Sequence, residues 1–201
     1  MKVKALVLSL AVVATVFTGC GKKAETPAPA PTTPAPSTQT ETKSADTVTS
    51  ASVTDNIDVF QKSIGKDGKW IIAITKDLST DKELVVDGDF KNGKKDAKTG
   101  AELYQRKIAL YNQDDKHVVT ARYTLTAPKI TFNSINGSIE HGTFKGDVYV
   151  SGKNFKLVNA KIDGNVYFLN EDAQKTFTIA DVASNLDSVK TVVTGKTELK
   201  K

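Results

Sequence analysis

The chain has 201 residues, of which 39% are hydrophobic, 7% aromatic and 25% charged, and its formal net charge is +5. Such a composition is typical of a water-soluble fold and excludes a polytopic membrane protein. The single cysteine excludes an intramolecular disulfide and a zinc site built on cysteines, and two histidines are too few for a histidine-rich metal cage.

The first 19 residues have the pattern of a secretory signal peptide. Lys2 and Lys4 precede an apolar run of 13 residues at positions 5–17, and Thr18 and Gly19 supply small residues before a cysteine. Thirteen residues form a helix of roughly 20 Å, whereas the hydrocarbon core of a bilayer is about 30 Å thick. We therefore expect residues 1–19 to be a cleaved signal peptide rather than a permanent span.

Cys20, the only cysteine of the chain, directly follows Gly19. Thr18, Gly19 and Cys20 resemble the lipobox of bacterial lipoproteins, although Phe17 stands where leucine is usual. The resemblance implies a diacylglyceryl group on the Cys20 thiol, cleavage before Cys20 and, often, acylation of the new amino group. Two or three acyl chains anchor a protein stably, at about 0.8 kcal/mol per buried CH₂ group. The lipobox resemblance thus implies an exported protein that is anchored by lipid to the outer face of the bacterial cell membrane. The alternative is an ordinary secretory signal with an incidental cysteine.

Residues 20–54 have the composition of a flexible linker. Five of the six prolines lie here, at positions 27, 29, 31, 34 and 36, and Val48 and Val53 are the only sizeable aliphatic residues. Such a segment cannot bury enough apolar surface to offset the entropy that it would lose on ordering. We predict a disordered spacer with polyproline II stretches, which at about 3.1 Å per residue reaches on the order of 100 Å.

Residues 55–201 are long enough for one hydrophobic core, and their apolar residues mostly alternate with polar ones. Short alternating segments that are rich in β-branched and aromatic residues are typical of strands. These segments are residues 72–74, 84–86, 108–110, 130–132, 155–157 and 177–179. Helical spacing occurs at residues 57–64 and 181–193. The segment is therefore predicted to be an all-β domain with a short helix near each end.

Two series of repeats run through this domain. Residues 144–150 and 162–168 share the pattern apolar-x-Gly-x-Val-Tyr-apolar at an offset of 18, and residues 86–90 are interpreted as a truncated earlier member. In the other series, four apolar-x-apolar pairs begin 22, 25 and 22 residues apart. Their first residues are Ile108, Ile130, Phe155 and Phe177.

Repeats of this length favour a parallel β-helix, in which successive coils stack at about 4.8 Å and equivalent residues form columns. Glycine fits the tight corners of such coils, and asparagine or aspartate tolerates left-handed backbone there. Candidate corner residues are Asn133, Asn136, Asn154, Asn159 and Asp163. We predict a short right-handed parallel β-helix. The alternative is an antiparallel β-sandwich or barrel, in which Asn136-Gly137 would form a hairpin turn.

The apolar-x-Gly-x-apolar units weakly resemble those of bactofilin-type β-helices, which form polymers. The domain is also similar to those of uncharacterised lipoproteins of Gram-positive bacteria. The likeness covers about residues 70–170. It implies a β-helical surface domain, and its motif is too unspecific to transfer a function.

The sequence assigns no catalytic, cofactor-binding or metal-binding residue. His117 and His141 lack the spacing of a metal site and are expected to be exposed loop residues, and no Gly-x-Ser-x-Gly motif occurs. The enzymatic alternative is a polysaccharide lyase or hydrolase whose acidic side chains stack on successive coils, binding Ca²⁺ or acting as acid and base. The residues available for it are Asp87, Asp89, Asp147 and Asp163, with Arg106 and Arg122 as a base or carboxylate clamp.

Tyr149 and Tyr167 occupy equivalent positions in the repeat, between neighbours expected to face inward. We therefore expect them to point outward, one above the other. Together with Asp147 and Asp163, they are the candidate ligand-facing residues, for a carbohydrate or for another protomer. Residues 91–100 hold four lysines and one aspartate, which suits phosphate-rich wall polymers or anionic lipid headgroups; the alternative is a solvated insertion.

The sequence therefore predicts a lipid-anchored cell-envelope protein whose β domain binds or scaffolds without catalysis. The expected partners are the membrane, through the lipid, and either a cell-wall polymer or a second copy of the chain. Nucleic acid is not expected as a partner. Loss of residues 1–19 removes two lysines and no acid, so the net charge falls from +5 to only +3, and the protein is exported.

Overall fold

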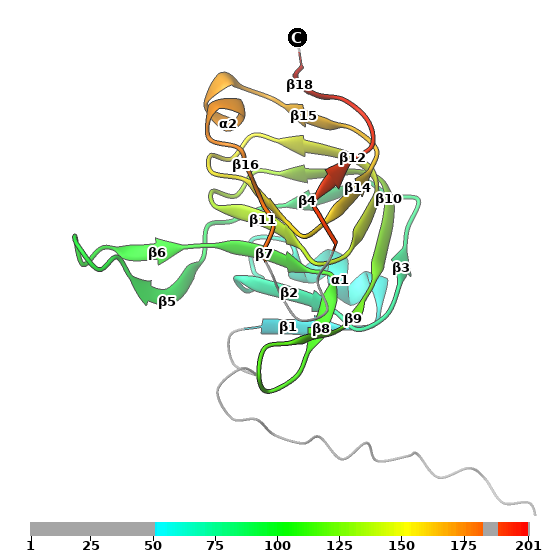
Figure 1. Cartoon of the computed structure of the whole chain (residues 1–201), viewed down its shortest axis with the longest axis horizontal. Helices are drawn as coiled ribbons and strands as arrows, with labels where there is room; N and C mark the ends of the chain where they lie inside the picture. The colour runs from blue at the N-terminus through cyan, green and yellow to red at the C-terminus, as the bar shows by residue number, and fades with distance from the viewer. Residues whose placement is uncertain (1–50, 183–188, 201) are drawn as a thin grey trace, which may run out of the picture. The chain divides into compact units, whose positions relative to one another are not determined.

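The computed structural model describes residues 51–182 and 189–200 (Figure 1). The expected signal peptide, Cys20 and most of the expected linker lie outside these residues, as do residues 183–188 of the second expected helix. Among the described residues, no helix combines the length and apolar character needed to cross a membrane.

Two large sheets hold most strands of the described ranges, and the strands paired within each of them run parallel. Sheet A has, in spatial order, β1 (Ala51–Thr54), β2 (Ile71–Ile74), β7 (Arg106–Ala109), β11 (Gly137–Glu140), β13 (Lys156–Val158) and β16 (Thr178–Ala180). Sheet B has β3 (Leu78–Ser79) and β4 (Leu84–Val86), then β10 (Thr124–Phe132) and β12 (Thr143–Val150), then β14 (Lys161–Asp163) and β15 (Val166–Phe168), and finally β17 (Val192–Val193) and β18 (Thr197–Leu199).

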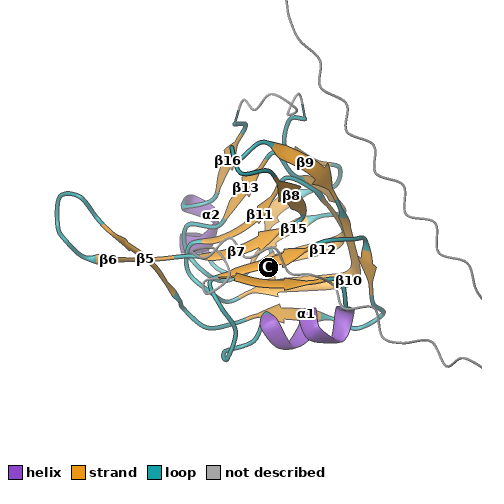
Figure 2. Ribbon diagram, turned by 90° about the horizontal axis from the view of Figure 1, so that it is seen from below, coloured by secondary structure: helices purple, strands orange, loops and turns teal. Residues whose placement is uncertain are grey.

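The chain passes repeatedly from one large sheet to the other (Figures 1 and 2). From β7 of sheet A it continues to β10 of sheet B, returns to β11 of sheet A, and goes on to β12 of sheet B and β13 of sheet A. From β2 onward, neighbouring strands of one sheet are therefore separated in sequence by at least one strand of the other, whereas β1 and β2 are separated only by helix α1 (Ile57–Ser63). This order explains why repeats about 20 residues apart lie side by side.

Two hairpins interrupt this path, one before β7 and one after it. The first joins β5 (Lys91–Lys95) to β6 (Glu102–Tyr104), and the second joins β8 (Tyr111–Gln113) to β9 (Val119–Arg122). They hold the only antiparallel strand pairs of the described residues. The prediction of an all-β domain is confirmed, whereas the antiparallel sandwich or barrel is wrong. Asn136-Gly137 is accordingly not a hairpin turn, since it connects β10 of sheet B to β11 of sheet A.

The repeat at residues 144–150 and 162–168 is confirmed as a pair of stacked parallel segments. Phe144 lies opposite Ile162, Val148 opposite Val166, and Tyr149 opposite Tyr167. Because the offset of 18 places like residues opposite one another, each apolar column of sheet B is continuous.

The other proposed repeats are assigned correctly only in part. The last spacing of 22 is confirmed, because Leu157 lies opposite Ile179 in sheet A. The first two spacings, of 22 and 25, are wrong, because Ile130 lies in sheet B whereas Ile108 and Leu157 lie in sheet A. Residues 86–90 are not aligned with 144–150 either, because Val86 lies opposite Phe132 at the end of the motif. We call one passage of the chain through sheet A and sheet B a circuit. The inserted hairpins lengthen some circuits, and the number of residues between two apolar pairs does not show whether a hairpin lies between them.

The core lies between the two sheets. Sheet A contributes Ile72, Ile108, Ile139 and Leu157, each at most 1% exposed. Sheet B contributes columns that include Phe144 and Ile162, and Phe132, Val150 and Phe168. Full burial of each such side chain contributes about 1.5–3 kcal/mol, so these columns supply the main favourable term of folding.

Glycine and asparagine occupy the tight positions of the circuits, as the sequence predicts. Gly146 has φ +136° and Gly164 has φ +159°, and a Cβ atom on Gly164 would overlap the carbonyl oxygen of Gly146. Three of the five candidate corner residues have left-handed backbone, with φ of 51°, 60° and 45°: Asn136, Asn154 and Asn159. Asn133 and Asp163 do not.

Of the expected helices, only the first is confirmed. Helix α1 (Ile57–Ser63) begins after Asn56, whose side chain accepts hydrogen bonds from the backbone N–H groups of Asp58 and Val59. The helix expected at residues 181–193 is wrong in its described part, where β17 forms at its end. Helix α2 (Glu171–Lys175), which the sequence does not predict, is five residues long and begins after Asn170.

The expected boundary at residue 55 is also corrected. The last four residues of the expected linker form β1, which pairs in parallel with β2 from Ala51 to Thr54. Main-chain pairing with a core strand fixes this segment, although Ala51 and Ser52 give it little apolar character.

Candidate functional site

The two tyrosines predicted to face outward form a ladder on the outer face of sheet B. The ring centroids of Tyr149 and Tyr167 lie 5.1 Å apart, and both side chains are half-buried. The Lys200 ammonium lies 4.5 Å from one centroid and 5.0 Å from the other, and donates a 2.6 Å hydrogen bond to the Tyr149 hydroxyl. A cation of the chain itself therefore covers the ring faces that a sugar would use.

The two predicted carboxylates near this ladder hold the chain together. Asp147 Oδ1 accepts hydrogen bonds from the backbone and side-chain amides of Asn165, at 2.9 and 2.8 Å. Asp163 is exposed and lies 4.0 Å from the Lys161 ammonium. In the sheet register Asp147 lies opposite Lys129, and Asp163 lies opposite Lys145. The carboxylates thus alternate with lysines and do not stack on one another.

The other acidic candidates are also engaged in structural contacts. Asp87 accepts from the Gly88 N–H and pairs with Lys66, and Asp89 accepts from the backbone N–H of Ile135. In residues 51–182 and 189–200, no group of three histidine, cysteine, aspartate or glutamate side chains is arranged to hold a metal ion.

Both arginines of the enzymatic alternative are bound to backbone carbonyl groups. Arg106 is fully buried and donates to the carbonyl oxygens of Ser63, Gly65 and Lys69. Burial lowers its pKa to about 10. Arg122 is half-buried and donates to the carbonyl oxygens of His141 and Asn159. The suggested role of Arg106 as a lyase base or clamp is therefore wrong, because its guanidinium is closed off from solvent.

Of the two histidines, only His117 is an exposed loop residue as expected. His141 is half-buried, with its ring 4.5 Å from that of Tyr111 in an edge-on arrangement. Burial lowers the pKa of His141, and the nearby Arg122 and Lys107 lower it further, against the opposing effect of Glu140.

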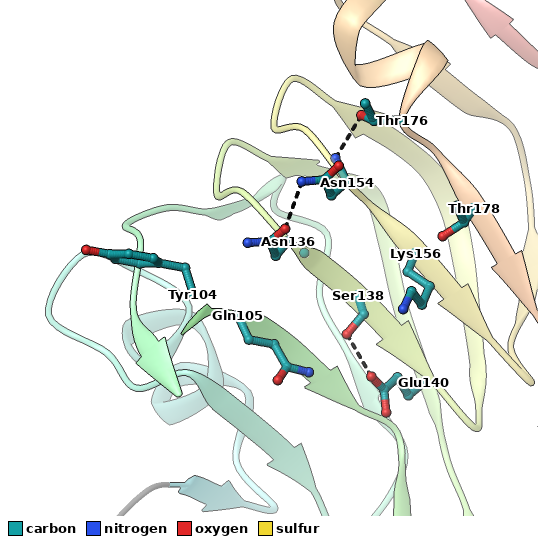
Figure 3. A pocket seen from close by; sticks show the side chains of 10 residues that line it. Tyr104, Gln105, Asn136, Ser138, Glu140, Asn154, Lys156, Thr176 and Thr178 are labelled. Atoms are coloured by element: carbon teal, nitrogen blue, oxygen red, sulfur yellow. Dashed lines mark hydrogen bonds between the residues drawn. The ribbon is translucent and has the colours of Figure 1, made fainter. Parts of the chain in front are cut away.

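A depression of about 420 Å³ lies on the outer face of sheet A, beside the root of the β5–β6 hairpin (Figure 3). We name it the sheet A groove. Its lining consists mainly of amide and hydroxyl side chains from successive circuits. These residues are Gln105, Asn136, Ser138, Asn154, Thr176 and Thr178. The rim is completed by Lys156 and by Tyr104 of β6, whose side chain is 37% exposed. Glu140 lies at the floor of the groove.

The amide and hydroxyl groups at one edge of the groove form a row across three circuits. Asn154 Nδ2 donates a 3.0 Å hydrogen bond to Asn136 Oδ1, and the Asn154 backbone N–H donates to Thr176 Oγ1 at 2.8 Å (Figure 3). The left-handed backbone of both asparagines turns the chain from sheet B into sheet A at this edge. The same residues that make the corners therefore present polar atoms at regular intervals.

An ion pair lies at the floor of the groove. Lys107 Nζ lies 2.7 Å from Glu140 Oε2, and Ser138 donates to the other carboxylate oxygen at 2.9 Å. The side chains are only 18% and 11% exposed. Burial acts to lower the pKa of Lys107, but attraction to Glu140 and Tyr111 outweighs it and raises that pKa. The Glu140 carboxylate is thus bonded on both oxygens, which suits a fixed acceptor better than a catalytic base.

A second depression, of about 430 Å³, continues the outer face of sheet A toward β1. Its floor is apolar, with Ala51, Val53, Ile71 and Ala73, and Tyr111 of the β8–β9 hairpin lies beside it. Lys107 lines this depression and Glu140 lines the groove. The ion pair therefore marks the border between the polar and apolar halves of the face.

Sequence reasoning missed the sheet A groove although its signal was present. The offset of 18 that relates the two tyrosine repeats also relates Asn136 to Asn154 and Ser138 to Lys156. A search for polar residues at this offset would have found these two circuits but not Thr176 and Thr178, which follow Asn154 and Lys156 by 22 residues. Gln105 and Tyr104 come from an inserted hairpin, and no repeat predicts where such a hairpin lies.

A scan against protein-family models found no match, and searches of the curated proteins and of the solved structures likewise found no similar protein.

Proposed function

We propose that this chain is an exported, lipid-anchored protein of the bacterial cell envelope whose β domain holds a glycan chain in the sheet A groove without cleaving it. The lipobox-like residues before Cys20 support the anchor, and the proline-rich spacer gives the domain reach from the membrane. Membrane contact is then made through the lipid, and the domain contacts the wall.

We further propose that the domain is a short right-handed parallel β-helix. Parallel pairing throughout sheets A and B supports this, as does the regular alternation of the chain between them. Connections between parallel strands of one sheet are right-handed in about 98% of cases, which supports the handedness.

The observation that carries the glycan proposal is the row of amide and hydroxyl groups along the groove. Such groups both donate and accept hydrogen bonds, as sugar hydroxyls do. Successive circuits repeat them at the strand spacing of about 4.8 Å, which suits a polymer better than a single small molecule. The exposed ring of Tyr104 adds an apolar surface beside them.

The groove is tested by replacing Lys156 with alanine and Thr178 with valine in one double variant. The two residues lie opposite each other in sheet A, are exposed, and make no hydrogen bond or ion pair with other described side chains. Loss of two polar contacts at about 0.5–1.5 kcal/mol each weakens binding roughly tenfold. Binding is measured by cosedimentation with peptidoglycan from which phosphate polymers have been stripped by hydrofluoric acid.

The matched control is Tyr149→Ala with Tyr167→Ala, on the outer face of sheet B. We expect this control to bind like the wild type. Loss of binding in the control alone would move the site to the tyrosine ladder, and the absence of wild-type binding would refute the glycan proposal. Release of soluble sugar during the incubation would refute the non-catalytic part. Circular dichroism verifies that both variants are folded.

The anchor is tested separately with Cys20→Ser. We expect the wild type to fractionate with membranes and its intact mass to include a diacylglyceryl group on Cys20, and we expect the variant to be released. Lys22→Ser, two residues away, should keep the anchor. If Cys20 of the wild type proved to be unmodified, the proposed lipid anchor would be refuted, and the proposal that the groove binds a glycan would be unaffected.

A further inference from the structure

The hairpin β5–β6, residues 91–104, projects from the body of the domain (Figures 1 and 2). Its last residue, Tyr104, lines the sheet A groove. We name it the lysine arm. Every residue of β5 except Asn92 is exposed, and so is every residue of β6. The arm therefore contributes little to the core.

The charge of the arm is mostly free to act on a ligand. Of its four lysines, Lys91 pairs with Glu102, whereas Lys94, Lys95 and Lys98 have no carboxylate within ion-pair distance among the described residues. Three ammonium groups are thus presented on one projecting ribbon.

The remaining acid of the arm is used to build its tip. Asp96 Oδ1 accepts hydrogen bonds from the backbone N–H groups of Lys98 and Thr99 and from the Thr99 hydroxyl. These bonds lower the Asp96 pKa. The Asp96 carboxylate is thus bonded within the turn and shapes the tip of the arm.

We propose that the lysine arm binds a linear polymer of phosphate diesters. This inference rests on the proposed function in that it gives the wall-binding face a second, anionic ligand. The cations of the arm are all lysines, and lysine binds phosphate as a point charge without requiring one fixed geometry.

The composition of the arm favours a polymer over an anionic bilayer. Insertion at a membrane interface needs apolar side chains at the tip, but the tip residues 96–100 are polar or small. The two large apolar residues that the arm exposes, Leu103 and Tyr104, lie near its root, where Tyr104 lines the groove. The root of the arm therefore borders the groove, while its charged part lies beyond it.

The test is a titration of the full mature chain with soluble poly(glycerol phosphate), comparing wild type with Lys94→Gln/Lys95→Gln/Lys98→Gln. The control, Lys82→Gln/Lys116→Gln/Lys145→Gln, removes three exposed lysines and the same charge from other surfaces. We expect the arm variant to bind at least about tenfold more weakly, with the slope of log Kd against log salt reduced by about two. We expect the control to change both quantities much less.

Three outcomes would contradict the inference. Equal losses of affinity in the two variants would show that only the net charge matters. If the wild type did not bind poly(glycerol phosphate), the proposed ligand would be refuted. Binding to phosphatidylglycerol vesicles but not to the polymer would assign the arm to the bilayer. The groove variant Lys156→Ala/Thr178→Val separates the two proposals: polymer binding that survives in it, after glycan binding is lost, belongs to the arm. If the stripped glycan does not bind but the polymer does, the groove proposal fails and the arm proposal stands.

Discussion

Replacing Gly146 with alanine should lower the free energy of unfolding by about 3 kcal/mol or more, because a side chain there meets two separate obstacles. The residue has φ +136°, a backbone conformation that is almost confined to glycine. A Cβ atom would also overlap the carbonyl oxygen of Ala127 on the neighbouring strand. That oxygen belongs to the backbone of a core strand and cannot move aside as a flexible side chain could.

The measurement is urea unfolding of the wild-type and variant chains, followed by circular dichroism. Gly65→Ala is the control, because its backbone φ lies outside the left-handed region and the nearest atom to a new Cβ would be 3.4 Å away. We expect Gly65→Ala to change stability by less than about 1 kcal/mol. Similar losses in both variants would contradict the stacking of Gly146 on Ala127.

Replacing Arg106 with methionine should cost about 3 kcal/mol of stability, since methionine keeps much of the side-chain volume but donates no hydrogen bond. The carbonyl oxygen of Ser63, at the end of α1, and those of Gly65 and Lys69, which follow the helix, would lose this hydrogen-bond donor. The guanidinium also lies 4.2 Å from the ring centroid of Phe90, and methionine would lose that contact. Relief from burying a cation offsets part of this loss, because Arg106 has no buried carboxylate partner at ion-pair distance among the described residues.

Arg106→Lys distinguishes charge from geometry in the same unfolding experiment. Lysine keeps the positive charge, but a single ammonium cannot reproduce the fork that reaches Ser63, Gly65 and Lys69. We expect a loss between those of wild type and Arg106→Met, and none for the exposed Lys94→Met. Full stability of Arg106→Lys would mean that charge alone matters at this position.

The stacking in sheet B could be predicted because its repeat has no insertion. Residues 144–150 and 162–168 are separated by one uninterrupted circuit, so their alignment in sequence became their register in the sheet. The pattern also placed Tyr149 and Tyr167 on the outer face, where their rings lie one above the other. Period-two alternation is enough for such predictions, because successive side chains of a strand point to opposite faces.

Circuits with insertions could not be predicted in the same way. Ile108 lies opposite Ile139 in sheet A, and the β8–β9 hairpin lengthens the chain between them, whereas Ile130 lies in sheet B. Hairpins carry alternating residues like any other strand, and local pattern does not state which partner a strand will choose. The predicted helix at 181–193 failed for a related reason: Val192 and Val193 have the β-branched side chains that suit β17.

The candidate site was predicted only in part, because sequence gives residues and not their neighbours. The tyrosines were placed correctly, but nothing near them in the sequence indicates that Lys200 lies over both rings. Arg106 is one of the two arginines available for the enzymatic alternative, and because arginine is usually exposed, the sequence does not indicate that this side chain is fully buried. The groove draws Ser138 from β11, Thr178 from β16 and Gln105 from the junction of β6 and β7, which only the order of sheet A brings together.

Whether the outer face of sheet A is the binding face can be measured directly by mapping amide chemical shifts during titration with soluble peptidoglycan fragments. We expect the largest changes on Ser138, Lys156 and Thr178, while Tyr149 and Tyr167 stay unchanged. Changes concentrated on the two tyrosines, with sheet A unaffected, would contradict this expectation.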